Sequence, residues 1–345
     1  MDTNFQSLSS KQGEINYRSK LSLQYLKKKT YFPNEPNQKQ IISALKQRIS
    51  SAKKDFNYLK KLGVKFTPYI EIGAEFSHRA MLLESKYKAN GFAVDLSLES
   101  LELANFFTKH LNLKKIPTRI CADAYNLPFP DNSMNLIFCY QTLHHFPNPK
   151  QIIKEMYRVL KPCGYFFVNE EPVSQTFNLN FWRRPTKLRS WEKFLKKILI
   201  LPFISRIGRT ETEHGILEET FGLKTWQRSL ESFENATVWI KPYPFGPQSK
   251  IIKGTKKNWL KPQLATRALI TIAGGGIKVL SRKGGHISES NNINISDLIV
   301  CPNCKIKLKN TKCLNCNFKY PILKGIPILI SPQTLKTLYP KVNVY

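Results

Sequence analysis

Apolar residues recur at three- and four-residue spacing between residues 41 and 59, and this pattern predicts an amphipathic helix. They are Ile41, Leu45, Ile49, Ala52, Phe56 and Leu59. Gly63 follows at a point where a helix can end. By contrast, residues 1–35 are polar and rich in lysine, with prolines at positions 33 and 36. We therefore expect residues 1–35 to form a flexible basic arm before the first regular element.

Downstream of this helix, short apolar runs alternate with helical patterns. Strands are predicted at 66–72, 91–95, 118–122, 134–140 and 165–169, and helices at about 76–88, 97–111 and 149–160. Near-continuous apolar character in strands is typical of a parallel sheet covered by helices on both faces. The sequence therefore predicts a Rossmann-like, doubly wound α/β domain over residues 36–172, which would bind ligands at the carboxyl ends of its strands.

The alternation ends after Pro172. Residues 173–290 mix basic, acidic and Pro- or Gly-rich stretches with one strand pattern at 236–240. We expect them to form a mixed insertion or cap, an acceptor-binding region that completes the domain. A polar linker leads from there into a compact cysteine module at 298–332.

The chain is strongly basic, with 54 Lys and Arg against 24 Asp and Glu and a net charge of +30. This charge either reflects a general bias toward Lys, Ile and Asn, or attracts RNA, anionic lipid or a phosphorylated substrate. Cys121, Cys139 and Cys163 suit reduced thiols, and no apolar run reaches the ~18 residues that span a bilayer. We expect a cytoplasmic protein, with peripheral membrane contact as an alternative.

The stretch PYIEIGAEFSHRA at 68–80 predicts a turn between a buried strand and a helix. Gly73 permits a tight turn, and the helix that follows offers unpaired N–H groups to a ligand. Asp95 ends the second strand, where a carboxylate can accept hydrogen bonds from both hydroxyls of a ribose. The alternative for Asp95 is a turn residue that caps the next helix. The order of these elements favours a nucleotide-like cofactor.

Further segments follow at the ends of later elements: CADA at 121–124, LPFPDNS at 127–133, QTLHHF at 141–146 and EMYRVLKPCG at 155–164. Together they resemble the UbiE-like, type-11 group of class I S-adenosylmethionine-dependent methyltransferases. The resemblance covers about residues 66–172.

The resemblance implies which residues hold S-adenosylmethionine. Asp95 matches the ribose ligand, and Asp123 matches the residue that hydrogen-bonds the adenine amino group. The other matching positions are Glu71, Gly73 and Ala74 in the turn by the methionine moiety, Ala124 beside the adenine, and Tyr140 and Gln141 next to the methyl donor.

The turn departs from the family pattern E-x-G-x-G-x-G, because Glu75 and Ser77 stand at the second and third glycine positions. The Glu75 side chain must then point away from the cofactor or meet its ammonium group. A carboxylate here would repel a pyrophosphate, whereas S-adenosylmethionine carries positive sulfonium and ammonium groups and no phosphate. The turn therefore favours S-adenosylmethionine over NAD.

Candidate catalytic bases are few. Methyl transfer needs the acceptor and the methyl group in attack geometry, and a base only where the acceptor loses a proton. His144 and His145 follow the fourth strand at the ligand edge, with a structural role in the turn as the alternative for at least one of them. His214 is a third candidate, within the acidic stretch ETEHGILEE. The alternative for this stretch is a solvated helix face without a catalytic role.

Two C-x-x-C pairs, Cys301 with Cys304 and Cys313 with Cys316, predict a closed tetrahedral zinc site of the structural, zinc-ribbon type. A disulfide is the alternative, which a reducing compartment disfavours. The segment YPILKGIPILI at 320–330 resembles the small zinc-binding activators of methyltransferases. The resemblance implies a module that binds and stabilises a methyltransferase, here within one chain.

These features predict an S-adenosylmethionine-dependent methyltransferase for a small-molecule, glycan or lipid-linked acceptor. Two alternatives stay open: an RNA methyltransferase that uses the basic surface and the zinc ribbon, and a non-catalytic scaffold. The segment CYQTLHH lacks the Asn/Asp-Pro-Pro-aromatic signature of enzymes that methylate adenine N6 or glutamine amides. An amphipathic basic pattern at 191–199 predicts either a lid helix or a helix lying in an anionic membrane surface.

Overall fold

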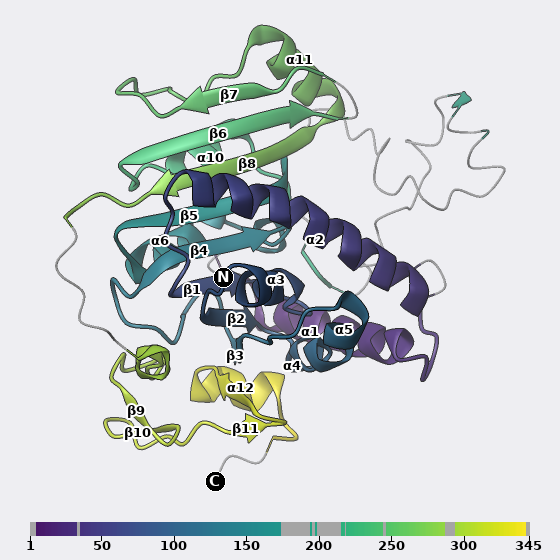
Figure 1. The fold of residues 1–345 in the computed structure, drawn as a ribbon, viewed down its shortest axis with the longest axis vertical. Helices are drawn as coiled ribbons and strands as arrows, with labels where there is room; N and C mark the ends of the chain where they lie inside the picture. Colours follow the sequence, from purple (N-terminus) through teal and green to yellow (C-terminus); the bar gives the residue numbers. More distant parts are fainter. Residues whose placement is uncertain are drawn as a thin grey trace.

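A ten-stranded sheet runs through the molecule in the order β11-β12-β3-β2-β1-β4-β5-β8-β6-β7 (Figure 1). The computed structural model describes residues 5–32, 35–173, 194, 197, 198, 215–217, 219–243, 246–286 and 294–342. The strands of the sheet are β1 (Tyr69–Ile72), β2 (Gly91–Asp95), β3 (Thr118–Ala122), β4 (Met134–Tyr140), β5 (Leu160–Val173), β6 (Asn235–Pro242), β7 (Ser249–Ile252), β8 (Gly275–Arg282), β11 (Ile322–Leu323) and β12 (Ile326–Leu329). A separate hairpin pairs β9 (Leu308–Lys309) with β10 (Lys312–Cys313).

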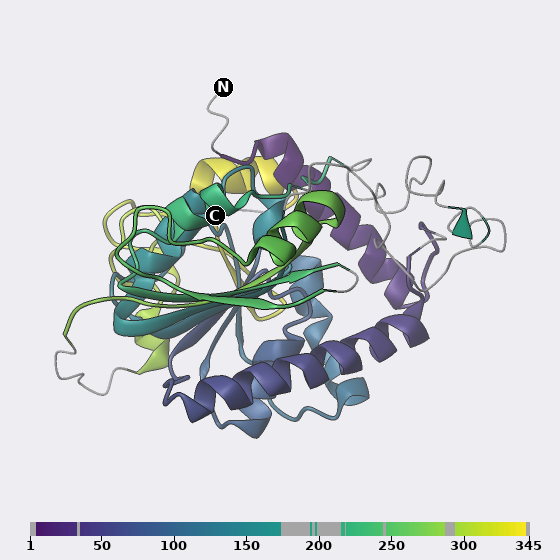
Figure 2. The ribbon, with the colours of Figure 1, turned by 90° about the horizontal axis from the view of Figure 1, so that it is seen from above.

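The centre of the sheet is parallel, and helices cover both of its faces (Figure 2). The helices are α1 (Leu8–Tyr25), α2 (Gln38–Lys61), α3 (His78–Lys86), α4 (Leu98–Glu102), α5 (Ala104–Leu111), α6 (Pro149–Val159), α10 (Leu223–Ser229), α11 (Leu264–Ala273) and α12 (Pro332–Leu338), with 3-10 turns η1 (Leu143–His145) and η2 (Ile295–Leu298). This arrangement confirms the Rossmann-like, doubly wound fold class.

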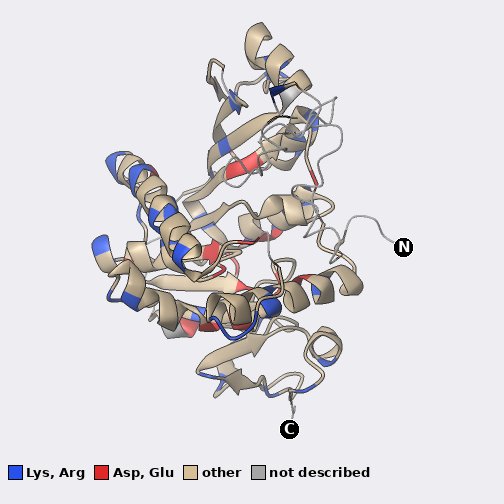
Figure 3. Ribbon diagram, turned by 90° about the vertical axis from the view of Figure 1, so that its right-hand side faces the viewer, with Lys and Arg blue, Asp and Glu red and all other residues tan. Residues whose placement is uncertain are grey.

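Alternate residues of the central strands face the two helical layers. In β1, Ile70 and Ile72 pack in one core with α6 and α10, whereas Tyr69 packs in the other with α2 and α3. The central strands are therefore buried on both faces of the sheet. Lysines lie along the exposed side of α2 (Figure 3); they are Lys39, Lys46, Lys53, Lys54, Lys60 and Lys61.

The prediction of a flexible arm is wrong for residues 8–25, which form α1. Tyr17, Leu21 and Tyr25 repeat every four residues along the helix and are buried. The Tyr25 ring meets the Phe76 ring edge-on at 5.7 Å between centroids, so an apolar stripe fixes the helix to the domain. Ser7 caps the start of α1 by accepting a hydrogen bond from the Ser10 N–H at 3.1 Å.

Residues beyond Pro172 extend the sheet past β5. Strand β8 pairs antiparallel with β5, and β6 and β7 add further antiparallel strands. The predicted cap or acceptor-binding role of 173–290 stays a prediction. The amphipathic pattern at 191–199 falls almost entirely outside the described residues. In the described part of the chain, no helix is long and apolar enough to cross a membrane.

The C-terminal module joins the opposite edge of the same sheet. Strand β12 lies parallel to β3, with Ile328 opposite Cys121 and Leu329 opposite Ala122. Helix α12 follows and contacts α1, so elements from both ends of the chain lie side by side (Figures 1 and 2). The module is thereby attached directly to the strand that ends at Ala122.

Candidate functional site

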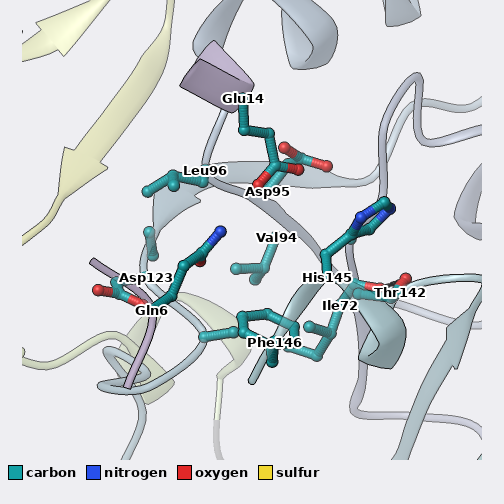
Figure 4. A pocket seen from close by; sticks show the side chains of 13 residues that line it. Gln6, Glu14, Ile72, Val94, Asp95, Leu96, Asp123, Thr142, His145 and Phe146 are labelled. Atoms are coloured by element: carbon teal, nitrogen blue, oxygen red, sulfur yellow. Dashed lines mark hydrogen bonds between the residues drawn. The ribbon is translucent and has the colours of Figure 1, made fainter. Parts of the chain in front are cut away.

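A pocket opens at the carboxyl ends of β1, β2 and β3 (Figure 4). It is lined by Gln6, Glu14, Ile72, Gly73, Val94, Asp95, Leu96, Ala122, Asp123, Ala124, Thr142, His145 and Phe146. Doubly wound sheets bind ligands at this edge.

The turn after β1 keeps a left-handed backbone at three positions, although only one of them is still glycine. Gly73 has φ +65°, and a Cβ there would lie 2.4 Å from Thr142 Oγ1, so only glycine fits. Glu75 and Ser77 replace the family's other glycines but still adopt φ of +50° and +57°. A left-handed conformation costs a non-glycine residue roughly 1–2 kcal/mol. The rest of the structure therefore holds the turn in the shape that glycines normally provide.

The Glu75 side chain points away from the pocket. Its carboxylate lies 3.0 Å from Arg48 Nη1 and 3.7 Å from Arg18 Nη1, and Glu75 is not among the lining residues. The Glu75 N–H instead donates to Asp95 Oδ2 at 2.8 Å. The replaced glycine thus leaves the pocket open and helps to orient the carboxylate of Asp95.

Asp95 lies at the end of β2 and faces the pocket. Besides the bond from Glu75, its Oδ1 accepts a hydrogen bond from the Ser97 N–H at 2.8 Å. The cap of α4 is Ser97, whose hydroxyl accepts from the Ser100 N–H, so Asp95 is not the capping residue. Burial, followed by the charge of Glu14, raises the pKa of Asp95 to about 6. Figure 4 shows the two carboxylates close together, with Glu14 coming from α1.

Asp123 follows β3 and lines the same pocket. Its Oδ1 accepts a hydrogen bond from the Tyr125 N–H at 3.0 Å, and its Oδ2 lies 2.5 Å from Lys11 Nζ. Lys11 belongs to α1, which also supplies Glu14, while Gln6 lines the pocket just before the helix. Sequence reasoning missed these residues because it expected a flexible arm. The four-residue repeat of tyrosine and leucine in residues 17–25 was the signal that could have found them.

The two histidines of η1 differ in surroundings. The fully buried carboxylate of Glu171 accepts hydrogen bonds from the backbone N–H groups of Thr142 and Leu143 and lies 2.9 Å from His144 Nδ1. Burial would raise the pKa of Glu171, but His144 and these N–H groups outweigh burial and lower it. His144 therefore anchors the turn and is not among the residues that line the pocket.

His145 lines the pocket, and its Nδ1 lies 3.0 Å from the carbonyl oxygen of Leu217. A carbonyl can only accept, so Nδ1 carries the hydrogen, and in the neutral ring Nε2 is the basic nitrogen. The third candidate base, His214, lies outside the described residues. Of the two candidate histidines that the structure describes, His145 is the one that lines the pocket.

Four of the predicted cofactor residues are not among those that line the pocket; they are Glu71, Ala74, Tyr140 and Gln141. The Glu71 carboxylate accepts a hydrogen bond from the Ala80 N–H at 2.9 Å, and burial raises its pKa to about 8. The Tyr140 hydroxyl donates to Asp55 Oδ2 at 3.1 Å. The cofactor roles of these four residues stay predictions.

Gly73, Asp95, Asp123 and Ala124 do line the pocket. Thr142 joins them, although nothing in its sequence context singled it out. Its hydroxyl donates to the Tyr140 carbonyl oxygen at 2.9 Å, which places the side chain against Gly73. The structure therefore brings together the predicted ribose and adenine ligands and the glycine turn.

The four predicted metal ligands form a second cluster. The Sγ atoms of Cys301, Cys304, Cys313 and Cys316 all lie within 4.8 Å of one another, and those of Cys301 and Cys316 are 3.9 Å apart. Tetrahedral zinc with Zn–S bonds of about 2.3 Å places its sulfurs about 3.8 Å apart. The cluster therefore has the donor set and the approximate spacing of a closed zinc site.

The fold and the pocket define a Rossmann-like, doubly wound α/β domain with a pocket at the carboxyl ends of its central strands. Residues 70–168 match the Methyltransf_11 family, a methyltransferase domain.

Relatives show the same domain over part of their length. An uncharacterized methyltransferase, YcgJ of Bacillus subtilis, is 32% identical over 35% of this chain and 49% of its own length. A demethylmenaquinone methyltransferase of Lactobacillus johnsonii is 30% identical over 38% of this chain and 50% of its own length. The chain thus spans about half the length of these curated relatives.

Among solved structures, a complex between the Haloferax volcanii Trm112 methyltransferase activator and a methyltransferase aligns with 71% of this chain and 98% of the matched chain. The sequence identity is 12% and the TM-score 0.40.

Proposed function

We propose that the protein is an S-adenosylmethionine-dependent methyltransferase whose donor binds in the pocket at the ends of β1, β2 and β3. The observation that carries this proposal is the meeting of Asp95, Asp123 and the Gly73 turn around one pocket. Asp95 would hold the ribose hydroxyls, Asp123 the adenine amino group, and the turn the methionine moiety. Bound there, S-adenosylmethionine supplies an activated methyl group.

The charge of the pocket supports this donor over a phosphate-bearing cofactor. Glu14, Asp95 and Asp123 all line it, and Lys11 offsets only one of these carboxylates. A negative lining attracts the sulfonium and ammonium groups of S-adenosylmethionine and repels a pyrophosphate.

His145 is the base we assign to acceptors that must lose a proton. With S-adenosylmethionine bound, the methyl group would pass to an acceptor oxygen or nitrogen, and the donor sulfur would leave as a neutral thioether. His145 Nε2 takes the proton that leaves the acceptor. The acceptor is a small molecule, a glycan or a lipid-linked precursor. The turn that positions His145 is fixed by Glu171 through the backbone N–H groups of Thr142 and Leu143.

The cysteine cluster is proposed to hold one structural zinc ion through Cys301, Cys304, Cys313 and Cys316. The module that contains it adds β12 to β3, the strand that leads to Asp123. It would thereby stabilise the cofactor edge in cis, as the resemblance to separate activators implies.

Two measurements test the methyltransferase assignment. Calorimetric titration should show binding of S-adenosylmethionine and no binding of NAD. Labelled methyl donor with fractionated cell extract should then yield a labelled product whose mass identifies the acceptor. Absence of cofactor binding would favour the non-catalytic scaffold, and salt-sensitive methylation of RNA would favour the RNA alternative.

A further inference from the structure

Helix α11 presents one apolar side to solvent. Leu264, Leu269 and Ile272 are 83%, 37% and 49% exposed, and Ala265 and Ala268 lie between them on the same side. These positions follow i, i+1, i+4, i+5 and i+8, which places them along one stripe of a helix.

The exposed stripe does not result from a loosely attached helix. On the opposite side of α11, Ile270 is buried in the core with Val238 and Ile240 of β6. Thr266 is fully buried, and its hydroxyl donates to the Pro247 carbonyl oxygen at 3.1 Å. Its oxygen also lies 2.8 Å from the hydroxyl of Ser249, at the start of β7. Helix α11 is therefore fixed to the sheet with its second apolar side outward.

The surroundings of α11 are positively charged. The sequence from 235 to 286 has ten Lys and Arg and no Asp or Glu. Six of these basic residues are exposed on α11, the neighbouring strands and the loop between β7 and α11; they are Lys241, Lys250, Lys256, Lys257, Lys261 and Arg267. In Figure 3, α11 is the mostly tan helix at the top, with basic segments below it. Exposed aliphatic residues beside unopposed positive charge match the two components of an anionic lipid surface.

The position of α11 relates this surface to the pocket. Strand β8 starts at Gly275, opposite Val173 at the carboxyl end of β5. Helix α11 ends two residues before Gly275, so it reaches the edge of the sheet at which the cofactor pocket opens. A molecule held at a surface along this edge would lie at the same edge of the sheet as the pocket.

We propose that α11 and the basic residues around it form a docking surface for an anionic lipid bilayer. The apolar stripe enters the boundary between headgroups and acyl chains, and the basic residues contact anionic headgroups. This inference rests on the proposed methyltransferase function only in assigning a lipid-linked acceptor to it. Nucleic acid would account for the charge but not for Leu264, Leu269 and Ile272, because phosphates and bases gain little from aliphatic side chains.

The test is co-sedimentation of the whole protein with phosphatidylcholine vesicles that contain or lack 30% phosphatidylserine. At low salt, the protein should bind the anionic vesicles at least tenfold more tightly than the neutral ones. The double variant Leu264→Glu, Leu269→Glu should lose this binding. A matched control, Leu62→Glu, Leu314→Glu, changes two exposed leucines outside α11 and should bind as the wild type does.

Charge is tested in the same assay. Lys256→Glu, Lys257→Glu should weaken binding to anionic vesicles at least tenfold, whereas Lys60→Glu, Lys61→Glu at the end of α2 should change it by less than threefold. Equal losses in the two pairs would mean that only the net charge matters, and would overturn the assignment to α11.

Other occupants of the stripe give distinct results. A wild-type dimer that Leu264→Glu, Leu269→Glu dissociates would show that a second copy covers the stripe. A lowered melting temperature in that variant would show that another segment of the same chain covers the stripe. RNA binding without vesicle binding would favour nucleic acid as the partner. Each result contradicts the proposal. Calorimetric binding of S-adenosylmethionine is measured separately, so failure of the cofactor site and failure of the membrane surface are distinguishable.

Discussion

Lys11 Nζ lies 2.5 Å from Asp123 Oδ2, and this ion pair joins α1 to the end of β3 across 112 positions of the chain. The two side chains are only 9% and 16% exposed. Removing one partner of an ion pair this well shielded from water leaves the other charge partly buried and uncompensated, which destabilises the fold. The contact therefore couples the docking of α1 on the domain to the position of Asp123, the proposed adenine ligand.

Lys11→Met tests this link. Methionine keeps the apolar stem but removes the ammonium group, so the free energy of unfolding should fall by about 1.5–3 kcal/mol. Denaturant unfolding measures this loss, and limited chymotrypsin digestion should cut at Tyr17 or Tyr25 sooner than in the wild type. Lys20→Met, at an exposed position of the same helix, is the control and should change neither result. An unaltered unfolding curve for Lys11→Met would mean that the ion pair does not hold α1.

Asp95→Ala should weaken binding of S-adenosylmethionine roughly 10- to 150-fold. The reason is the loss of a charge-assisted hydrogen bond to the ribose, which contributes about 1.5–3 kcal/mol. Isothermal titration measures the affinity. Asp131→Ala removes an exposed carboxylate that pairs with Arg158 outside the pocket and serves as the control. If Asp95→Ala binds as tightly as the wild type, Asp95 is not the ribose ligand.

Cofactor affinity should also depend on pH through Asp95. Its pKa is raised to about 6, so the carboxylate becomes protonated as the pH falls from 7 to 5. Protonation removes the acceptor that the ribose hydroxyls need, and affinity should decrease toward tenfold per pH unit below pH 6. Titrations between pH 5 and 8 test the direction. In Asp95→Asn this dependence should be absent, and a wild-type affinity that increases on acidification would contradict the assignment.

One zinc ion per chain is expected in the cysteine cluster. Cys301→Ser, Cys304→Ser should abolish it and unfold the C-terminal module, because a closed zinc site contributes folding free energy. Elemental analysis of the purified protein and loss of β-structure in circular dichroism are the measurements. The control is Cys163→Ser, which changes a cysteine outside the cluster, and this variant should keep the zinc ion. Full zinc content in the double variant would refute the ligand set.

The parallel centre of the fold was accessible from sequence because its strands carry continuous apolar runs, such as Phe92 to Val94 and Leu136 to Cys139. Asp95 and Asp123 were accessible for a related reason, since they directly follow such runs at one edge of the sheet. Helix α1 was missed because lysines and serines dilute its buried stripe. The pairing of β12 with β3 joins residues about 200 positions apart, and no local pattern reports a contact of that range.

The edge of β3 has a consequence during synthesis of the protein. Residues 118–122 leave the ribosome long before residues 326–329, which pair with them. At bacterial to eukaryotic translation speeds the interval is roughly 10–40 s. During that time an unpaired strand edge is open to other nascent chains, and such edges template aggregation. Translation rate and chaperone supply should therefore govern the yield of native protein, and chains terminated before β12 should be recovered mainly in the insoluble fraction.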